Sequence, residues 1–206
     1  MSKLFQANTQ CLVTGGAGFV GSHLVDRLMS LGLKVRVLDN FANGKRENVA
    51  QHEESERFSL VGGSILDPEV VADAMSDVNV VFHLACLGVR HSLRFPMENH
   101  KVNAEGTLIV LEASRDKGVE RFLYCSSSEI YGTATEVPMT ESHNTHPATV
   151  YGASKLAGES YTRAAYITHG MKVVLVRPFN IFGPRSHHEG DAGELIPKTI
   201  VRALSG

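Results

Sequence analysis

A tyrosine and a lysine lie four residues apart in the stretch VYGASKLAGE, residues 150–159, which otherwise has the small-residue composition of an ordinary helix. Positions i and i+4 of a helix share one face, so Tyr151 and Lys155 are expected to lie side by side. An ammonium group beside a phenol lowers the pKa of the phenol towards the range of a general base. This spacing is common in helices, and its meaning depends on what the chain places beside it.

Three glycines, Gly15, Gly18 and Gly21, follow an apolar run in the stretch VTGGAGFVGSHL. Between a strand and a helix, glycines at this spacing let backbone N–H groups and the positive helix end approach a pyrophosphate. The alternative is a tight turn without a ligand. Asp39, at the end of the next apolar run, favours the nucleotide because a carboxylate there can accept hydrogen bonds from the ribose hydroxyls.

The same carboxylate indicates which dinucleotide is bound. Asp39 would repel a 2′-phosphate, so the sequence favours NAD over NADP as the cofactor. Arg36 and Arg46 are nearby cations that would reverse this preference if they bound the phosphate. Solvated surface positions are the simpler interpretation for both.

The elements that must position these residues are short apolar runs alternating with longer stretches of helical period, the pattern of a parallel sheet covered on both faces. We predict strands at 11–14, 34–39, 57–61, 78–85, 120–125 and 171–177. We predict helices that begin near Phe19, Glu69, Met97 and Val150, with glycines at three helix ends, Gly32, Gly118 and Gly170. The expected fold class is α/β, a doubly wound parallel sheet of the Rossmann type.

Length and composition exclude several other classes of protein. The chain has 206 residues, 43% of them hydrophobic, and a net charge of −2, which suits one large domain and leaves no basic patch for nucleic acid or anionic lipid. No apolar run has the length of a membrane span, and the first residues do not resemble a signal peptide. Cys11, Cys86 and Cys125 lie in or just after apolar runs, which indicates buried free thiols and a cytoplasmic protein.

Taken together, the motifs resemble those of the short-chain dehydrogenase/reductase superfamily, in its extended branch of NAD-dependent nucleoside-diphosphate-sugar epimerases, dehydratases and decarboxylases. The resemblance spans residues 10–200 and is carried, in order, by TGGAGFVG, LDN, HLA, SSSEIYG, YGASK and RPFNIFGPR. It implies that Tyr151 removes a sugar hydroxyl proton while the carbon beneath it gives hydride to NAD. It also implies that Lys155 lowers the pKa of Tyr151 and holds the nicotinamide ribose, and that Ser127 hydrogen-bonds the reacting oxygen, with Ser126 ending the strand.

The resemblance implies a larger set of residues around cofactor and substrate. Those expected at the NAD site are Gly15, Gly18, Phe19, Val20, Gly21, Asp39, Asn40, Ser64, Ile65, Leu84, Ala85, Cys86, Asn103, Tyr151, Lys155 and Pro178. Those expected at the substrate are Arg90, Ser127, Asn180 and Arg185. An internal backbone cap is an equal alternative for Asn103 and Asn180, and a surface position is the alternative for the two arginines. Ser64 stands where the family usually has an aspartate facing adenine, so that contact is expected to be weakened or replaced.

The reaction is less well defined than the family. Relatives oxidise a sugar carbon, usually C4, to a ketone, and groups beside the tyrosine determine how the ketone then reacts. Dehydratases have an Asp-Glu pair just after the serine or threonine, where this chain has Ser128 and Glu129, which disfavours a dehydratase. A Ser-Glu pair occurs in UDP-glucuronate decarboxylases, whereas an epimerase needs no second acid or base. We expect 4-epimerisation of a UDP-hexose or UDP-hexuronate; a dehydratase, a decarboxylase and a non-catalytic NAD-binding fragment are the alternatives.

Arginines and a histidine-rich run are the remaining candidates for contact with the substrate. The stretch GVRHS, with Arg90, resembles a loop of UDP-glucuronate 4-epimerases, and either Arg90 or Arg185 would suit a carboxylate or diphosphate. The run SHHEGDAGE contains His187, His188, Glu189 and Asp191. Adjacent histidines rarely face one ion, so a substrate-covering loop is expected there and no metal.

The expected organisation is an NAD-binding domain over residues 1–180 and, over 181–206, the start of a substrate-binding lobe that relatives continue further. We therefore expect NAD to bind while sugar-nucleotide affinity and turnover are reduced. The loop at 132–149 is long enough to be functional. Relatives dimerise through helices that correspond to residues 97–117 and 150–169, so the resemblance implies a homodimer.

Overall fold

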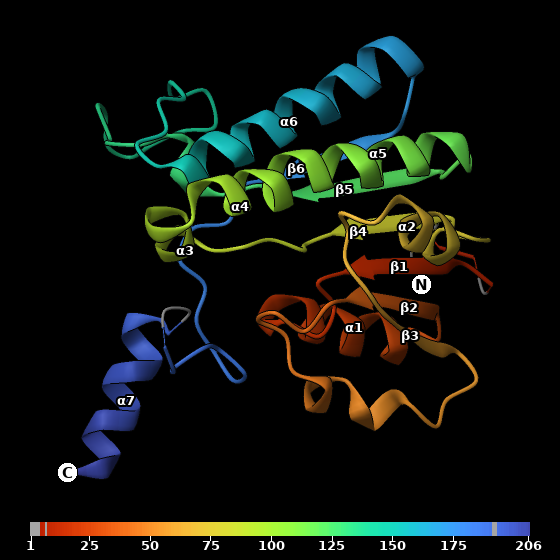
Figure 1. Cartoon of the computed structure of the whole chain (residues 1–206), viewed down its shortest axis with the longest axis horizontal. Coiled ribbons are helices and arrows are strands. Elements are labelled where there is room, and N and C mark those ends of the chain that lie inside the picture. Colours follow the sequence, from red (N-terminus) through yellow and green to blue (C-terminus); the bar gives the residue numbers. More distant parts are fainter. Residues whose placement is uncertain (1–4, 7, 191–192) are drawn as a thin grey trace.

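The computed structural model describes residues 5–6, 8–190 and 193–206. Its centre is a six-stranded parallel sheet in the order β3-β2-β1-β4-β5-β6 (Figure 1). The strands are β1 Gln10–Thr14, β2 Lys34–Asp39, β3 Phe58–Gly62, β4 Val80–His83, β5 Arg121–Cys125 and β6 Val173–Val176. The order reverses between β1 and β4, as in a doubly wound Rossmann sheet, and the predicted fold class is confirmed.

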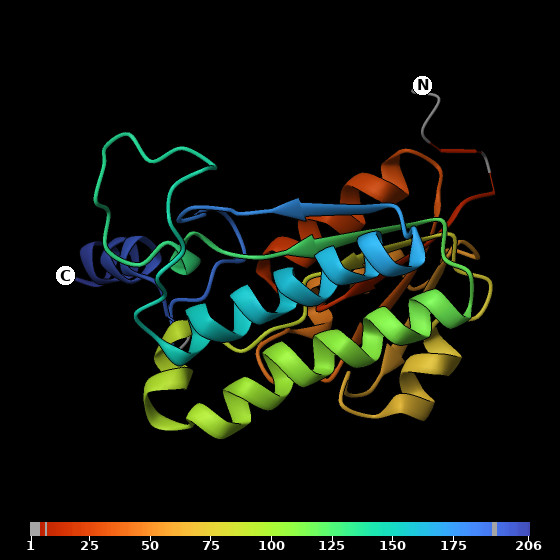
Figure 2. The ribbon, with the colours of Figure 1, turned by 90° about the horizontal axis from the view of Figure 1, so that it is seen from above.

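Helices cover both faces of this sheet. Helix α1, Phe19–Ser30, lies on one face, and three helices lie on the other, α2 Pro68–Ala74, α5 Gly106–Asp116 and α6 Val150–His169 (Figures 1 and 2). Helix α4, Pro96–His100, continues through the π-helical turn η3, Lys101–Glu105, into α5. The remaining helical elements are α3 Val89–Arg94, α7 Leu195–Ser205 and the short turns η1 Arg46–Asn48, η2 Ala50–His52 and η4 Ser128–Ile130.

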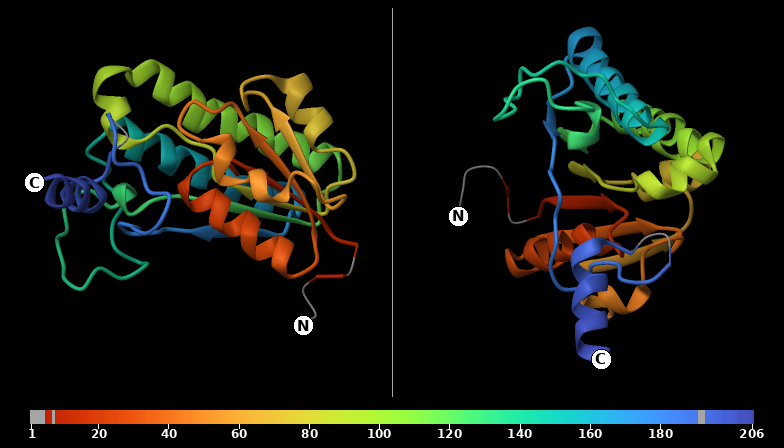
Figure 3. Two further views of the ribbon diagram at one scale, coloured as in Figure 1. Left: turned by 90° about the horizontal axis from the view of Figure 1, so that it is seen from below. Right: turned by 90° about the vertical axis from the view of Figure 1, so that its left-hand side faces the viewer.

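The predicted helix starts agree with this arrangement to within one residue. Helices α1 and α6 begin at the predicted Phe19 and Val150, whereas α2 and α4 begin one residue early at a proline, which suits the first position of a helix. Helices α3 and α7 were not predicted. Helix α7 lies away from α5 and α6 (Figures 1 and 3) and none of its side chains is buried.

The core is divided by the sheet into two apolar clusters. Val13, Val35 and Val37 pack with α1 on one face, and Leu12, Leu38 and Val81 pack with α2, α5 and α6 on the other. The alternation along each strand results from the two-residue period of strand side chains. Because all six strands are parallel, their carboxyl ends meet at one edge, and the residues that come after β1, β2, β4 and β5 are gathered there.

Two further expectations can be compared with the structure. The described residues contain no helix that is both long and apolar enough to cross a membrane. All three cysteines are free, but only Cys11 is fully buried, while Cys86 and Cys125 are half-buried at the carboxyl edge of the sheet. The expectation of buried thiols is therefore wrong for the last two, because they follow β4 and end β5 at the exposed edge.

Candidate active site

Helix α6 carries the tyrosine and the lysine to the carboxyl edge of the sheet. The helix begins there because Thr149 accepts a hydrogen bond from the Gly152 N–H at 3.0 Å, which caps its first turn. Lys155 is buried and its Nζ donates to the carbonyl of Cys125 at 2.8 Å. The same ammonium lies 5.3 Å from the centre of the Tyr124 ring and 5.9 Å from that of Tyr151. The ammonium is thus held near Tyr151, as the i, i+4 spacing predicts, and near Tyr124 of β5, which that spacing does not predict.

Ser127 completes this group from the other side. It lies just before η4, where its Oγ accepts a hydrogen bond from the Glu129 N–H at 3.2 Å, and it lies near enough to the Tyr151 side chain to lower the pKa of that phenol. Ser126, in contrast, still pairs with the sheet, because its N–H donates to the carbonyl of Val176 at 2.8 Å. The structure therefore brings together the serine, tyrosine and lysine that the sequence singled out.

The electrostatics of Tyr151 differ from the sequence expectation in one respect. Burial raises the pKa of Tyr151 to about 12, although the charge of Lys155 and the side chain of Ser127 both act to lower it. Burial alone would lower the pKa of Lys155, but the surrounding Cys86, Tyr124 and Tyr151 raise it, so the ammonium stays protonated. In this state Tyr151 is a hydrogen-bond donor at neutral pH, and Lys155 offsets only part of the effect of burial.

The glycine turn after β1 is shaped for close approach. Gly15 has a φ of 69°, and it lies so close to the segment after β4 that an added Cβ would be 2.8 Å from the Cα of Ala85. Gly18 precedes α1 in an extended conformation, no side chain among the described residues caps this helix, and its first turn contains no acid. The first N–H groups of α1, at Phe19, Val20 and Gly21, are therefore suited to a pyrophosphate.

Asp39 lies beside this turn at the end of β2. Its two carboxylate oxygens accept hydrogen bonds from the Ala17 N–H at 2.9 Å and the Phe41 N–H at 2.8 Å. Burial raises the pKa of Asp39 and these two bonds act against it. Arg36 donates to the carbonyls of Ala74 and Ser76, and Arg46 pairs with Glu53 at 2.8 Å. Both arginines are thus engaged by other parts of the protein, which agrees with the preference for NAD.

Other predicted cofactor residues have local partners. Asn103 is buried and its amide pairs with both the N–H and the carbonyl of Leu87, at 2.8 and 2.9 Å, which is the alternative of an internal backbone cap. Ser64 accepts a hydrogen bond from the Leu66 N–H, and Asn40 accepts one from the Ala42 N–H. The segment after β4, beside the glycine turn, holds three further predicted residues, Leu84, Ala85 and Cys86. The side chain of Ile65 is buried. The carbonyl of Pro178 accepts a hydrogen bond from the Ser128 N–H at 3.0 Å.

The predicted substrate residues are less closely grouped. The stretch GVRHS is not a loop but the start of α3, because Gly88 is extended and the chain becomes helical at Val89. Arg90 on this helix donates to the carbonyl of Gly193. Arg185 forms an ion pair with Asp26 of α1 at 2.8 Å, while Asn180 is exposed beyond β6. These contacts connect the segment after β6 to α1 and α3. For Arg185, the ion pair with Asp26 favours a structural role over contact with substrate.

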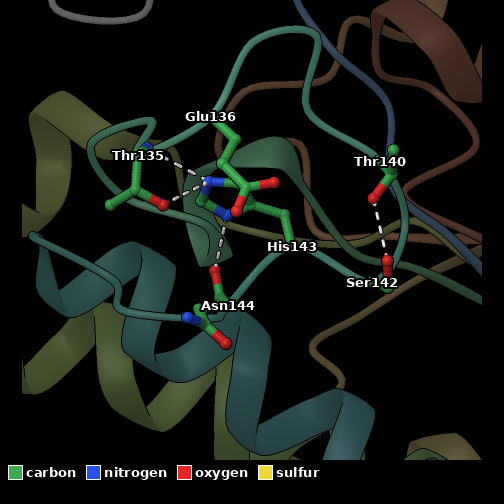
Figure 4. Close-up of a pocket in the computed structure, with 6 residues that line it drawn as sticks. All are labelled: Thr135, Glu136, Thr140, Ser142, His143 and Asn144. Carbon is green, nitrogen blue, oxygen red and sulfur yellow. Dashed lines mark hydrogen bonds between the residues drawn. The ribbon is translucent and has the colours of Figure 1, made fainter.

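The loop at 132–149 is closed on itself. Gly132 has a φ of 66°, and an added Cβ would collide with the carbonyl of His146, so the two ends of the loop touch. Within it the His143 ring accepts from the Thr135 N–H at 3.1 Å and donates to the Asn144 carbonyl at 2.9 Å (Figure 4). The polar pocket of about 100 Å³ drawn in Figure 4 lies inside this loop and is not lined by the catalytic candidates.

Reasoning from sequence missed a charged cluster behind the catalytic residues. Arg177, just after β6, pairs with both carboxylate oxygens of Glu159 at 2.9 and 2.7 Å. Its remaining N–H groups reach the hydroxyl of Tyr131 and the carbonyl of Glu141, each at 2.9 Å. Glu159 lies on the helix face of Tyr151 and Lys155, one further i+4 step along, and that continued spacing was the available signal.

The histidine-rich run has mostly surface contacts. Asp191 lies outside the described residues; Glu189 lies 3.9 Å from Lys45, and His188 lies 3.4 Å from Glu189. Within the part of the chain that the structure describes, no cluster of histidine, cysteine, aspartate and glutamate side chains is suited to a metal ion.

The parallel sheet, the glycine turn with Asp39 and the Tyr-Lys-Ser group are together the features of the short-chain dehydrogenase/reductase class. A family model described as "NAD dependent epimerase/dehydratase family" matches residues 11–206. The chain belongs to this family, and its cofactor is NAD.

Known relatives carry several activities within this family. The chain is 37% identical to a UDP-glucose 4-epimerase of Mycolicibacterium smegmatis, over 88% of this chain and 59% of the relative. It is 36% identical to UDP-glucuronic acid decarboxylase 4 of Arabidopsis thaliana, over 94% of this chain and 43% of the relative. Among solved structures, dTDP-glucose 4,6-dehydratase of Streptomyces venezuelae with NAD bound superimposes with a TM-score of 0.89 at 33% identity, covering 96% of this chain and 63% of that one. The chain thus spans about three fifths or less of the length of these relatives.

Proposed function

We propose that this chain is an NAD-dependent nucleotide-sugar epimerase that inverts C4 of a UDP-hexose or UDP-hexuronate through a transient 4-keto sugar. The observation that carries the proposal is the assembly of Tyr151, Lys155 and Ser127 at the carboxyl edge of the sheet. The residue after Ser127 is the neutral Ser128, where a dehydratase of the Asp-Glu type has an acid.

Each of the three side chains has a separate role. Ser127 hydrogen-bonds the reacting sugar oxygen and orients it towards Tyr151. Tyr151 takes the hydroxyl proton during oxidation and returns it during reduction, while Lys155 supports the phenolate with its positive charge. NAD would be held by the glycine turn and Asp39, and when bound it would supply a reversible hydride acceptor for the sugar carbon and a further positive charge that favours the phenolate. Return of the hydride to the opposite face of the ketone inverts the centre and needs no further acid or base.

Two other reactions are alternatives. The Ser128–Glu129 pair and the similarity to a decarboxylase favour loss of carbon dioxide from a 4-keto hexuronate. The similarity to a dehydratase supports loss of water, although Ser128 cannot supply the acid. A non-catalytic NAD-binding fragment is the alternative from another class.

The test is incubation of the protein with NAD and, separately, UDP-glucose, UDP-glucuronate and UDP-N-acetylglucosamine, with products separated by chromatography and weighed by mass spectrometry. An isomer of unchanged mass without accumulation of NADH supports the epimerase. Loss of carbon dioxide or water would replace it with a decarboxylase or dehydratase, and steady NADH release would indicate a simple alcohol dehydrogenase. Tyr151→Phe is the matched control, because it should keep NAD binding. NAD binding in calorimetry without any product would support the non-catalytic alternative.

We also propose that the protein is a cytoplasmic homodimer. Its three free thiols suit a reducing compartment.

The homodimer is supported by exposed apolar side chains on α5 and α6. Leu108 on α5 is 38% exposed, and Tyr166 and Ile167 on α6 are 60% and 66% exposed, so these side chains offer an apolar surface to a second copy. Sedimentation of the parent and of Ile167→Glu tests the dimer; a parent that sediments as a monomer at micromolar concentration would refute it.

A further inference from the structure

A buried histidine links the two segments that border the cofactor site. His83 ends β4, is 1% exposed, and lies between Thr14 at the end of β1 and Thr107 on α5. Its Nδ1 is 2.7 Å from the Thr14 hydroxyl and its Nε2 is 2.9 Å from the Thr107 hydroxyl. The ring also stacks on Tyr124 at 5.8 Å between ring centres.

The directions of these hydrogen bonds are set by their neighbours. Thr107 donates its single hydroxyl hydrogen to the carbonyl of Asn103 at 2.7 Å, so it must accept from His83. The imidazole proton is therefore on Nε2, and Nδ1 accepts from the hydroxyl of Thr14. The Thr14 oxygen in turn accepts from the Ala85 N–H at 3.3 Å. A single tautomer of His83 thus satisfies every hydrogen bond in this series from Asn103 to Ala85.

The hydrogen bonds beyond Thr107 lead back to the backbone that follows β4, near Ala85. Asn103 pairs with the backbone of Leu87 and donates to Asn99 at 3.0 Å, and Asn99 donates to the carbonyls of Leu87 and Gly88. Asn99, Asn103 and Thr107 succeed one another at i+4 steps through the π-helical turn. The segment 84–88 is thus held at Ala85 through Thr14 and at Leu87 through Asn103, with His83 joining the two.

We propose that His83 is a positioning residue for NAD binding: through Thr14 it sets the spacing between the glycine turn at Gly15 and the segment at Ala85. The proposal rests on the proposed function, with residues 84–86 lying against NAD as the family resemblance implies. The spacing is narrow, because an added Cβ on Gly15 would lie 2.8 Å from the backbone of Ala85. A small shift of either segment therefore alters the surface offered to the cofactor.

The test compares NAD affinity, measured by calorimetry, with thermal stability for His83→Asn and His83→Gln in the full chain. The asparagine amide is level with Nδ1 and keeps an acceptor for Thr14, whereas the glutamine amide is level with Nε2 and keeps only the donor to Thr107. We expect His83→Gln to weaken NAD binding roughly tenfold, as for one lost hydrogen bond, and His83→Asn to stay within about threefold.

Variants of Thr14 provide the second arm. Thr14→Val removes both the bond to His83 and the acceptor for the Ala85 N–H, so it should weaken NAD binding at least as much as His83→Gln. Thr14→Ser keeps the hydroxyl and should keep the parental affinity. The Thr14→Val/His83→Gln double variant should bind NAD no more weakly than Thr14→Val alone, because the bond between the two side chains is already absent there. Unchanged NAD affinity in His83→Gln with only a lower melting temperature would overturn the proposal. Equal losses in His83→Asn and His83→Gln would do the same.

Amide exchange of Ala85 separates this proposal from the proposed function. If the parent chain does not bind NAD, the cofactor assignment fails, and exchange of the Ala85 N–H then decides whether His83 positions this segment. Faster exchange in His83→Gln than in His83→Asn supports the role, and equal exchange refutes it.

Discussion

The Arg177–Glu159 ion pair holds α6 against the end of β6, two helical turns beyond Tyr151. The Glu159 side chain is 6% exposed and that of Arg177 is 25% exposed. The hydrogen bond to Glu159 is the main reason why the pKa of Arg177 is raised. A different ion pair, Arg115 with Asp116 at 2.8 Å, is exposed to solvent, with side chains 38% and 64% exposed. It offers a comparison for the effect of burial.

Glu159→Gln keeps the shape of the side chain but sets an amide N–H₂ against the guanidinium. One of the two hydrogen bonds is lost, and the other keeps its charged donor but gains a neutral amide oxygen as acceptor. Hydrogen bonds to charged groups contribute about 1.5–3 kcal/mol each. Removing one partner of a fully buried pair costs about 3–5 kcal/mol, and the partial exposure of Arg177 reduces this. We therefore expect a loss of about 2–3 kcal/mol, or a fall in melting temperature of about 4–12 °C for a chain of this size.

Urea unfolding monitored by circular dichroism measures the effect as a lower midpoint with an unchanged slope. Asp116→Asn is the control, and we expect it to change the free energy of unfolding by less than about 1 kcal/mol, as for exposed pairs. A Glu159→Gln variant that loses no more stability than Asp116→Asn would refute the reasoning that burial makes this pair important. Arg177→Lys should also be destabilised, because lysine cannot bind both carboxylate oxygens of Glu159 in parallel.

Three further predictions concern the catalytic and cofactor residues. Burial raises the pKa of Tyr151 to about 12 from an ordinary value of 10.0. The stability that the neutral Tyr151 side chain contributes is therefore complete below about pH 10 and is lost as the pH rises towards 12. Tyr151→Phe should flatten that part of the plot of unfolding free energy against pH. Lys155→Met removes the charge that lowers the pKa of Tyr151, so the rise of turnover with pH should move upward by at least about one pH unit; an unchanged profile would contradict the role of Lys155. Asp39→Asn should weaken NAD binding about tenfold in calorimetry and narrow the preference for NAD over NADP, because the charge that repels a 2′-phosphate is gone; an unaltered preference would exclude Asp39 as its source.

Much of the fold could be predicted because its causes are local. The strand-to-helix glycine turn, the alternation of apolar runs and the glycines after three helices are all features of neighbouring residues. The same holds for Tyr151 and Lys155, whose meeting is a consequence of helix geometry alone. Ser127 could be placed only by resemblance, since nothing local distinguishes it from Ser126 or Ser128.

The contacts that could not be predicted depend on residues distant in the chain. The partner of Arg185 is Asp26 on the first helix, and the partner of Arg177 is Glu159 on a separate element. Whether an arginine meets a substrate or an internal acid depends on how the chain after β6 folds back, which leaves no periodic pattern. The helix at Val89 was missed because six residues are too few for a clear period.

The small residues of α6 determine how closely its catalytic face approaches the sheet. An added Cβ on Gly152 would lie 2.7 Å from the carbonyl of Glu129, in the turn just after Ser127. One on Gly158 would collide with the Tyr124 hydroxyl, beneath the ammonium of Lys155. Larger side chains at these positions would move Tyr151 away from Ser127. The close approach also buries the phenol and raises its pKa, so the packing that assembles the site makes the positive charge of Lys155 necessary.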